Sequence, residues 1–159
     1  MIIYQGSDLL NYLEEKLNIF STNNVRVIII DKFYDLNQRT KKIIEYIREL
    51  LDLNNPIIWF YEVDRVNSSL EYFDAFDLKN YDLNFHDRFI FLYDLDLESY
   101  VLNLHIGASL NGVKFHLEAD EFDIFRISVI DADYENLDSI QNQLENIYLK
   151  ETKKEKWDY

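Results

Sequence analysis

Two short, almost purely apolar runs with one long amphipathic segment between them constrain the fold of this chain most strongly. Residues 25–30 (VRVIII) and 57–63 (IIWFYEV) have the length and β-branched or aromatic character of buried strands. Between them, residues 35–53 repeat apolar side chains at helical spacing, and Asn54-Asn55-Pro56 ends that helix. The apolar stripe consists of Ile43, Ile44, Ile47, Leu50 and Leu51. Such a strand–helix–strand unit predicts parallel strands joined by a right-handed crossover.

Apolar patterning also predicts the remaining elements. A first helix is expected after Ser7, which has the residue type of an N-cap. We also expect a short helix over 68–76, an acidic aromatic loop over 77–87, strands at 88–94, 100–110, 113–118 and 122–131, and a closing helix over 135–150. With 48% hydrophobic residues, the chain can build a real core despite its charge. The sequence therefore predicts one α+β domain over 1–159. It would combine a mixed β-sheet, the N-terminal strand–helix–strand unit, a C-terminal antiparallel meander or hairpin, and packed helices.

Asn111-Gly112 is the strongest turn signal and sets a register for the predicted hairpin. A two-residue turn there would place His105 opposite Glu118 and diagonal to His116. These three side chains are candidates for acid–base catalysis or for a metal site. A solvated sheet face also explains them, and it is favoured because the sequence has no phosphate-binding loop and no nucleophile motif. We therefore expect no enzymatic activity, no cofactor and no bound metal.

The surplus of negative charge lies within one stretch of the chain. Residues 62–149 contain 19 acidic and 5 basic residues, a net charge of −14, and the other residues sum to zero. Aromatic residues alternate with the acids, and Lys79 is the only basic residue between Glu71 and Asp87. In a surface of this kind, the carboxylates provide long-range attraction and the aromatic rings provide a large contact area. Such a surface suits a basic protein partner. The same charge repels nucleic acid and anionic membranes.

Candidate partner contacts lie in two clusters of the acidic stretch. The first consists of Tyr72, Asp74, Asp77, Tyr81, Asp82 and Asp87, and the second of Asp120, Glu121 and Asp123. Alternatively, the aromatic residues belong to the core and the acids simply point to water. Two further acidic runs, 94–98 and 131–135, follow predicted strands. Paired acids there can hold a divalent ion, but ordinary strand-terminal acids explain them better.

Other features bear on the cellular compartment. Cysteine is absent, which excludes disulfides and thiolate chemistry and fits a reducing environment. The first residues, MIIYQ, lack the basic segment of a signal peptide, and no apolar run approaches the roughly 20 residues of a membrane span. We therefore expect a cytoplasmic protein.

The acidic, aromatic profile resembles that of bacterial immunity proteins of contact-dependent inhibition and related polymorphic toxin systems. The resemblance comes from the Tyr/Asp/Phe-rich stretch 71–98, from the lack of cysteine, and from a set of later acids: Asp120, Glu121, Asp123, Asp131, Asp133 and Glu135. It implies a protein that binds a cognate toxin, often a basic nuclease, and covers its active site. Three alternatives stay open: a DNA-mimicking anti-defence inhibitor, a small hydrolase or nuclease that uses His105, His116 and Glu118, and a structural subunit.

Overall fold

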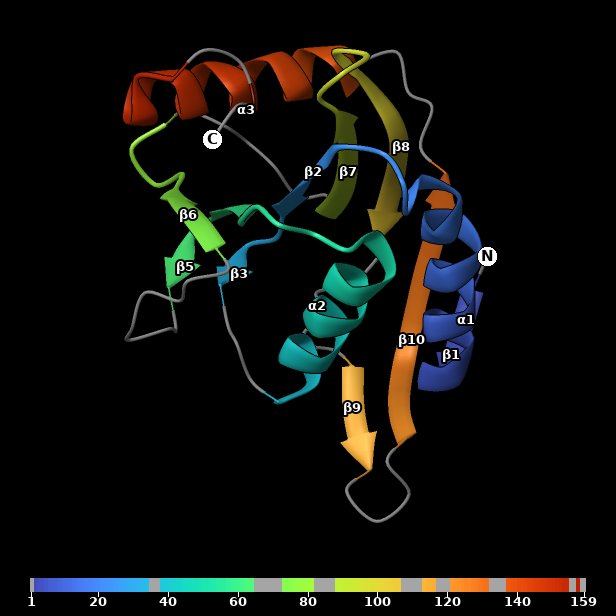
Figure 1. Cartoon of the computed structure of the whole chain (residues 1–159). Helices are drawn as coiled ribbons and strands as arrows, with labels where there is room; N and C mark the ends of the chain where they lie inside the picture. Colours follow the sequence, from blue (N-terminus) through green and yellow to red (C-terminus); the bar gives the residue numbers. More distant parts are fainter. Residues whose placement is uncertain are drawn as a thin grey trace.

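One mixed β-sheet organises the chain in the computed structural model (Figure 1), which describes residues 2–34, 38–64, 73–81, 88–106, 113–116, 121–131, 137–154 and 157. The strands are β1 (Ile2–Gln5), β2 (Val25–Ile30), β3 (Phe33–Tyr34), β4 (Ile57–Tyr61), β5 (Val63–Asp64), β6 (Phe73–Asp77), β7 (Arg88–Asp94), β8 (Ser99–Ile106), β9 (Val113–His116) and β10 (Glu121–Asp131). The helices are α1 (Gly6–Leu17), the short 3₁₀ helix η1 (Asn18–Phe20), α2 (Gln38–Leu51) and α3 (Leu137–Thr152). None of the helices within these ranges has the length and apolar character needed to cross a membrane.

The order of strands confirms the predicted α+β class with a mixed sheet. The main sheet runs β1-β10-β8-β7-β2-β4-β6, with β9 paired to β10 outside this path, and β3 pairs with β5 in a separate small sheet. Strands β2 and β4 are parallel, with Ile28 opposite Ile58, so the predicted strand–helix–strand unit is confirmed. Strand β6 adds to β4 in parallel, whereas β7, β8, β10 and β1 continue in antiparallel pairs.

Helices cover both faces of the central strands, which explains why five of the six residues of β2 are apolar. Val25, Val27 and Ile29 pack in a core with α1 and α2, whereas Ile28 and Ile30 pack in a second core with α3. In Figure 1, α3 crosses the top of the molecule, away from α1 and α2. Because successive strand residues point to opposite faces, a strand between two helical layers needs apolar residues at nearly every position.

Residues 73–76 are part of a strand, so the predicted short helix is wrong there. Phe73 packs edge to face on Trp59 in the α1–α2 core, with ring centroids 5.6 Å apart. Phe76 stacks on Phe60 on the α3 side, at 5.4 Å. Two residues three apart share a face of a helix but lie on opposite faces of a strand. The two cores on either side of β4 therefore select the strand.

The antiparallel arrangement of the C-terminal strands is confirmed, but the predicted register, which places His105 opposite Glu118, is wrong. Strand β8 lies between β7 and β10, and His105 has Phe89 on one side and Ile130 on the other. Both edges of β8 are therefore used over these residues, and β9 pairs with the far end of the long strand β10 instead. The turn residues Asn111 and Gly112 lie outside the described residues. Strand β1, which the sequence did not indicate, pairs with the other edge of β10.

Candidate functional site

Asp74, one of the predicted partner contacts, has a partner within the protein. It lies on the edge strand β6, where its Oδ2 is 3.5 Å from Nη2 of Arg26. Arg26 belongs to β2 and is completely buried, and its guanidinium lies 6.0 Å from the ring centre of Tyr148 on α3. The Asp74 side chain is 35% exposed. Because a buried cation needs a compensating charge, Asp74 contributes to the fold, and its role in partner binding stays a prediction.

Asp77 and Tyr81 follow on the same edge and are tied to neighbouring residues. The Asp77 carboxylate accepts a hydrogen bond from the Lys79 backbone N–H at 2.8 Å and lies 4.0 Å from the Lys79 ammonium. The Tyr81 hydroxyl donates to Oε1 of Glu151 on α3 at 2.5 Å. This hydrogen bond to a carboxylate raises the pKa of Tyr81. Strand alternation places Asp74 and Asp77 on opposite faces of β6, so they do not form one contact surface.

The other predicted contacts are placed only in part. Tyr72, Asp82, Asp87 and Asp120 lie outside the described residues. On β10, Glu121 is opposite His116 and Asp123 is opposite Lys114 of β9. These two acids of the second cluster therefore have a basic or titratable residue at the paired position, and the role of the cluster in binding stays a prediction.

The proposed catalytic or metal-binding set is not brought together. His105 pairs with Ile130 and His116 with Glu121, nine positions apart on β10. At about 3.3 Å per residue, this separation is about 30 Å along the strand. The His105 ring instead lies 5.2 Å from the ring of Phe89. Glu118 is outside the described residues, and no metal-ligating cluster of three His, Asp or Glu side chains occurs in the part of the chain that the structure describes.

The loop between β7 and β8 presents a fixed acidic tip, which we call the hairpin tip (residues 95–98). Asp94, only 3% exposed, holds it. Its Oδ1 accepts hydrogen bonds from the backbone N–H groups of Asp96 and Leu97, both at 2.9 Å, and its Oδ2 accepts one from Asn23 Nδ2 at 3.1 Å. These bonds agree with a strand-terminal acid. Glu98 adopts φ 52°, an uncommon conformation for a residue with a Cβ. Asp96, Leu97 and Glu98 are all exposed.

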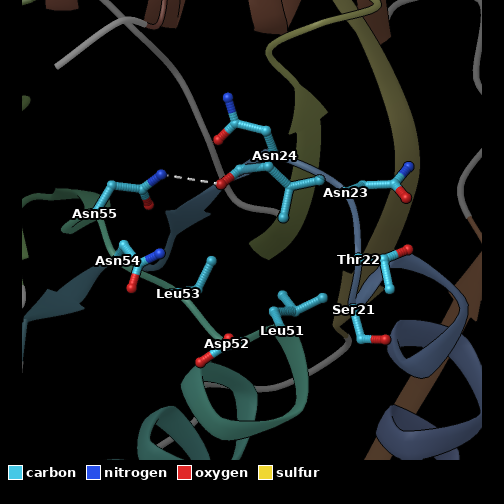
Figure 2. A pocket seen from close by; sticks show the side chains of 10 residues that line it. Ser21, Thr22, Asn23, Asn24, Leu51, Asp52, Leu53, Asn54 and Asn55 are labelled. Carbon is cyan, nitrogen blue, oxygen red and sulfur yellow. Dashed lines mark hydrogen bonds between the residues drawn. The ribbon is translucent and has the colours of Figure 1, made fainter.

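A polar pocket of about 430 Å³ lies at the amino-terminal ends of the parallel strands β2 and β4. Figure 2 shows its two walls, residues 21–24 on one side and Asp52, Asn54 and Asn55 on the other, with Leu51 and Leu53 between them. Its lining consists of Ser21, Thr22, Asn23, Asn24, Val25, Leu51, Asp52, Leu53, Asn54 and Asn55. Polar residues from both connections therefore line one cavity.

The end of α2 shapes one wall of the polar pocket. Asp52 N–H donates to the Glu49 carbonyl at 3.2 Å, and Leu53 N–H donates to the Arg48 carbonyl at 3.1 Å. This pair of bonds is the Schellman arrangement, which needs a left-handed residue at its centre and usually has glycine there. Asp52, with φ 49°, occupies that position. A carboxylate thus stands where folding alone would favour glycine.

The loop between α2 and β4 is fixed by side chains at both ends. The Arg48 guanidinium donates to the carbonyls of Leu53 and Asn55, at 3.3 and 3.2 Å. Asn55, 4% exposed, donates from Nδ2 to the Val25 carbonyl at 3.1 Å, the bond drawn in Figure 2. These contacts connect helix, loop and sheet, so the pocket wall is preformed.

The hairpin tip and the polar pocket adjoin each other. Leu95 N–H donates to the Asn24 carbonyl at 2.9 Å, which joins the tip to the pocket wall. Ile19 of η1, two residues before Ser21, is 72% exposed, and Leu97 is 67% exposed; these are the large apolar side chains most exposed to solvent within the described ranges. We call Ile19, the polar pocket, Asp94 and the hairpin tip together the acidic pole. From the sequence, Asn54-Asn55 indicates only the end of a helix, although the matching positions of Asn23-Asn24 and Asn54-Asn55 before two parallel strands indicate a common edge of the sheet.

Comparison with family models, with curated proteins and with solved structures found no match for this chain. Its function is therefore inferred from its own residues and their geometry.

Proposed function

We propose that this protein is a non-catalytic binding protein that captures a basic protein partner through its acidic pole, as an immunity-type inhibitor of a nuclease-type toxin. The observation that carries the proposal is the hairpin tip, where the exposed Leu97 lies between the exposed carboxylates of Asp96 and Glu98. An apolar side chain on a fixed loop provides contact area at low entropic cost. The flanking carboxylates provide attraction and orientation.

The net charge of −14 supports the same function at longer range. A strongly negative molecule attracts a basic partner during diffusion and raises the association rate. After docking, Leu97 and Ile19 would be the apolar centre of the contact, and the carboxylates would occupy positions that the phosphates of the toxin's substrate otherwise take. Inhibition by such occlusion requires no reaction at the surface of this protein. Asp77 and Tyr81 on the β6 edge are secondary contact candidates.

The proposal is tested by identifying the partner and then measuring association with purified components. Affinity purification from the native host supplies candidates, and each candidate is purified and mixed directly with this protein. The association rate is expected to fall steeply between about 50 and 500 mM salt, because screening shortens the range of attraction. A rate that is flat over this range contradicts electrostatic capture.

Matched charge reversals locate the contact. Glu98→Lys on the hairpin tip is expected to lower the association rate several-fold at low salt. Glu45→Lys on α2 makes the same change in net charge at an exposed position outside the pole and is expected to have a smaller effect. Leu97→Ala is expected to raise the dissociation rate with little change in association. Equal effects of the two charge reversals would place the contact elsewhere on the molecule.

A further inference from the structure

Asn55, which lines the polar pocket, has a buried acceptor oxygen that no donor within the described part of the chain reaches. Asn55 donates its amide N–H to Val25, which fixes the orientation of the amide and turns Oδ1 away from that bond, toward the side of Asn54 (Figure 2). No donor among the described residues reaches Asn55 Oδ1, although Asn55 is 96% buried. An unsatisfied buried carbonyl oxygen destabilises the fold. A ligand that brings an N–H group into the pocket would satisfy it.

The charges around the pocket favour a cation. The carboxyl-terminal end of α2 has a partial negative charge from its backbone dipole, and Asp52 adds a full one at the same point. Asp96 and Glu98 extend the negative field from the adjoining hairpin tip. Arg48 of the same helix directs its guanidinium at the carbonyls of Leu53 and Asn55. An anionic ligand would therefore meet repulsion from several sides.

The shape of the pocket favours a long side chain with an apolar stem. Leu51 and Leu53 lie between the two polar walls (Figure 2), so methylene groups find apolar contact there. Ser21 and Thr22 belong to the opposite wall. Arginine combines an apolar stem with a planar group of five donors. Its guanidinium can address several separated acceptors at once, which an ammonium group does less well.

We propose that the polar pocket receives the guanidinium group of an arginine side chain, with Asn55 Oδ1 and the Asp52 carboxylate as its acceptors. The arginine would come from the basic partner, so this inference rests on the proposed function. Together with the exposed Leu97 beside it, a buried arginine would form the centre of the contact, the kind of residue that dominates binding at interfaces.

The test is a titration of the full chain with two small probes, in which NMR measures the shifts of the backbone amide resonances. The probes are Nα-acetyl-arginine methylamide and its neutral isostere, Nα-acetyl-citrulline methylamide. We expect saturable shifts at residues 21–25 and 51–55 with the arginine probe, and at least severalfold weaker binding of the citrulline probe. Equal binding of the two probes, or no saturable shift in these residues, would overturn the proposal.

Two charge-neutralising variants separate the pocket from the rest of the surface. Asp52→Asn keeps the preference for a left-handed conformation but removes the charge, and it is expected to weaken the arginine probe several-fold. Glu45→Gln removes one charge from the exposed face of the same helix, outside the pocket, and is expected to leave probe binding unchanged. Equal weakening by both variants would show general charge attraction and overturn the pocket assignment.

The two proposals can fail separately. If the arginine probe does not bind while association with a basic partner still depends on salt and on Glu98, the pocket assignment is wrong and the proposed function stands. If the partner's affinity is the same for Asp52→Asn and the wild type, the pocket does not hold the partner's arginine. If the probe binds the pocket and Asp52→Asn weakens it, but no basic partner associates directly, arginine recognition is supported and the proposed function is contradicted.

Discussion

Replacing Asp74 by Asn removes the carboxylate that faces the buried guanidinium of Arg26. The sequence placed Asp74 among the partner contacts, where its loss would affect binding and leave folding unchanged. The structure indicates a cost to folding, because Arg26 is fully buried and Asp74 Oδ2 lies 3.5 Å from its Nη2. The side-chain volume hardly changes, so the effect reports the charge.

The magnitude follows from the distance and the exposure. Two unit charges 3.5 Å apart interact by about 5 kcal/mol at an effective dielectric constant of about 20. Asp74 is about one third exposed, so solvent screens part of this energy, and Arg26 has other contacts that persist. We expect a loss of about 2 kcal/mol in the free energy of unfolding. For a chain of this length, such a loss lowers the melting temperature by about 4–8 °C.

Asp77→Asn is the matched control on the same strand. Asp77 and Lys79 are both exposed, and their charged atoms lie 4.0 Å apart, so the substitution is expected to cost no more than about 0.5 kcal/mol. Thermal and urea unfolding of both variants, followed by circular dichroism, measures the difference. A melting temperature for Asp74→Asn within 1–2 °C of the wild type, or equal to that of Asp77→Asn, would refute the role given to the Arg26–Asp74 pair.

Further expectations concern the left-handed residue Glu98 and the partly buried phenol of Tyr100. Glu98→Gly removes a Cβ from a position at φ 52° and is expected to stabilise the fold by about 0.5–1 kcal/mol in urea unfolding; a loss of stability would contradict this account of the hairpin tip. Trp157 Nε1–H donates to the Tyr100 hydroxyl at 2.7 Å, so Tyr100→Phe leaves a buried donor unpaired and should cost about 1–2 kcal/mol. Burial, together with the carboxylates of Glu145 and Asp138, raises the pKa of Tyr100 above its ordinary 10.0, against the lowering effect of the Trp157 hydrogen bond. Because the pKa of Tyr100 is raised in the folded state, the stability that the neutral phenol contributes to the fold is complete below pH 10. This stability declines as the pH rises further, because the phenol ionises more readily in the unfolded chain. Between about pH 8 and 11, the melting temperature should therefore fall more steeply with pH for the wild type than for Tyr100→Phe. The same pH dependence in both proteins would contradict this role of Tyr100.

The local sequence pattern was sufficient to predict those helices and strands whose own residues show the periodicity of the element. The buried strands β2 and β7 begin and end at the predicted residues, and the parallel pairing of β2 with β4 follows from the helix between them. Helix α3 confirms the predicted closing helix over its described residues, and it buries Leu137, Leu144, Ile147 and Tyr148. In each case the residues carry the periodicity of the element itself.

Long-range competition explains what the sequence did not indicate. The turn signal at Asn111-Gly112 favours a local hairpin, but β7 and β10 occupy both edges of β8 at Leu104 and His105. Strand β6 was misread because its two phenylalanines serve two separate cores. The acidic pole combines residues from three distant segments, near positions 20, 53 and 96. No spacing rule within one segment predicts such a meeting.

The chain has two tryptophans, and the central sheet separates them. Trp59 is buried with α1 and α2, whereas Trp157 is buried with α3. Each indole is thus a natural optical reporter for one half of the interior. Trp59→Phe and Trp157→Phe would each leave a single emitter, and comparing their fluorescence during unfolding would reveal whether the two halves melt in concert or one after the other.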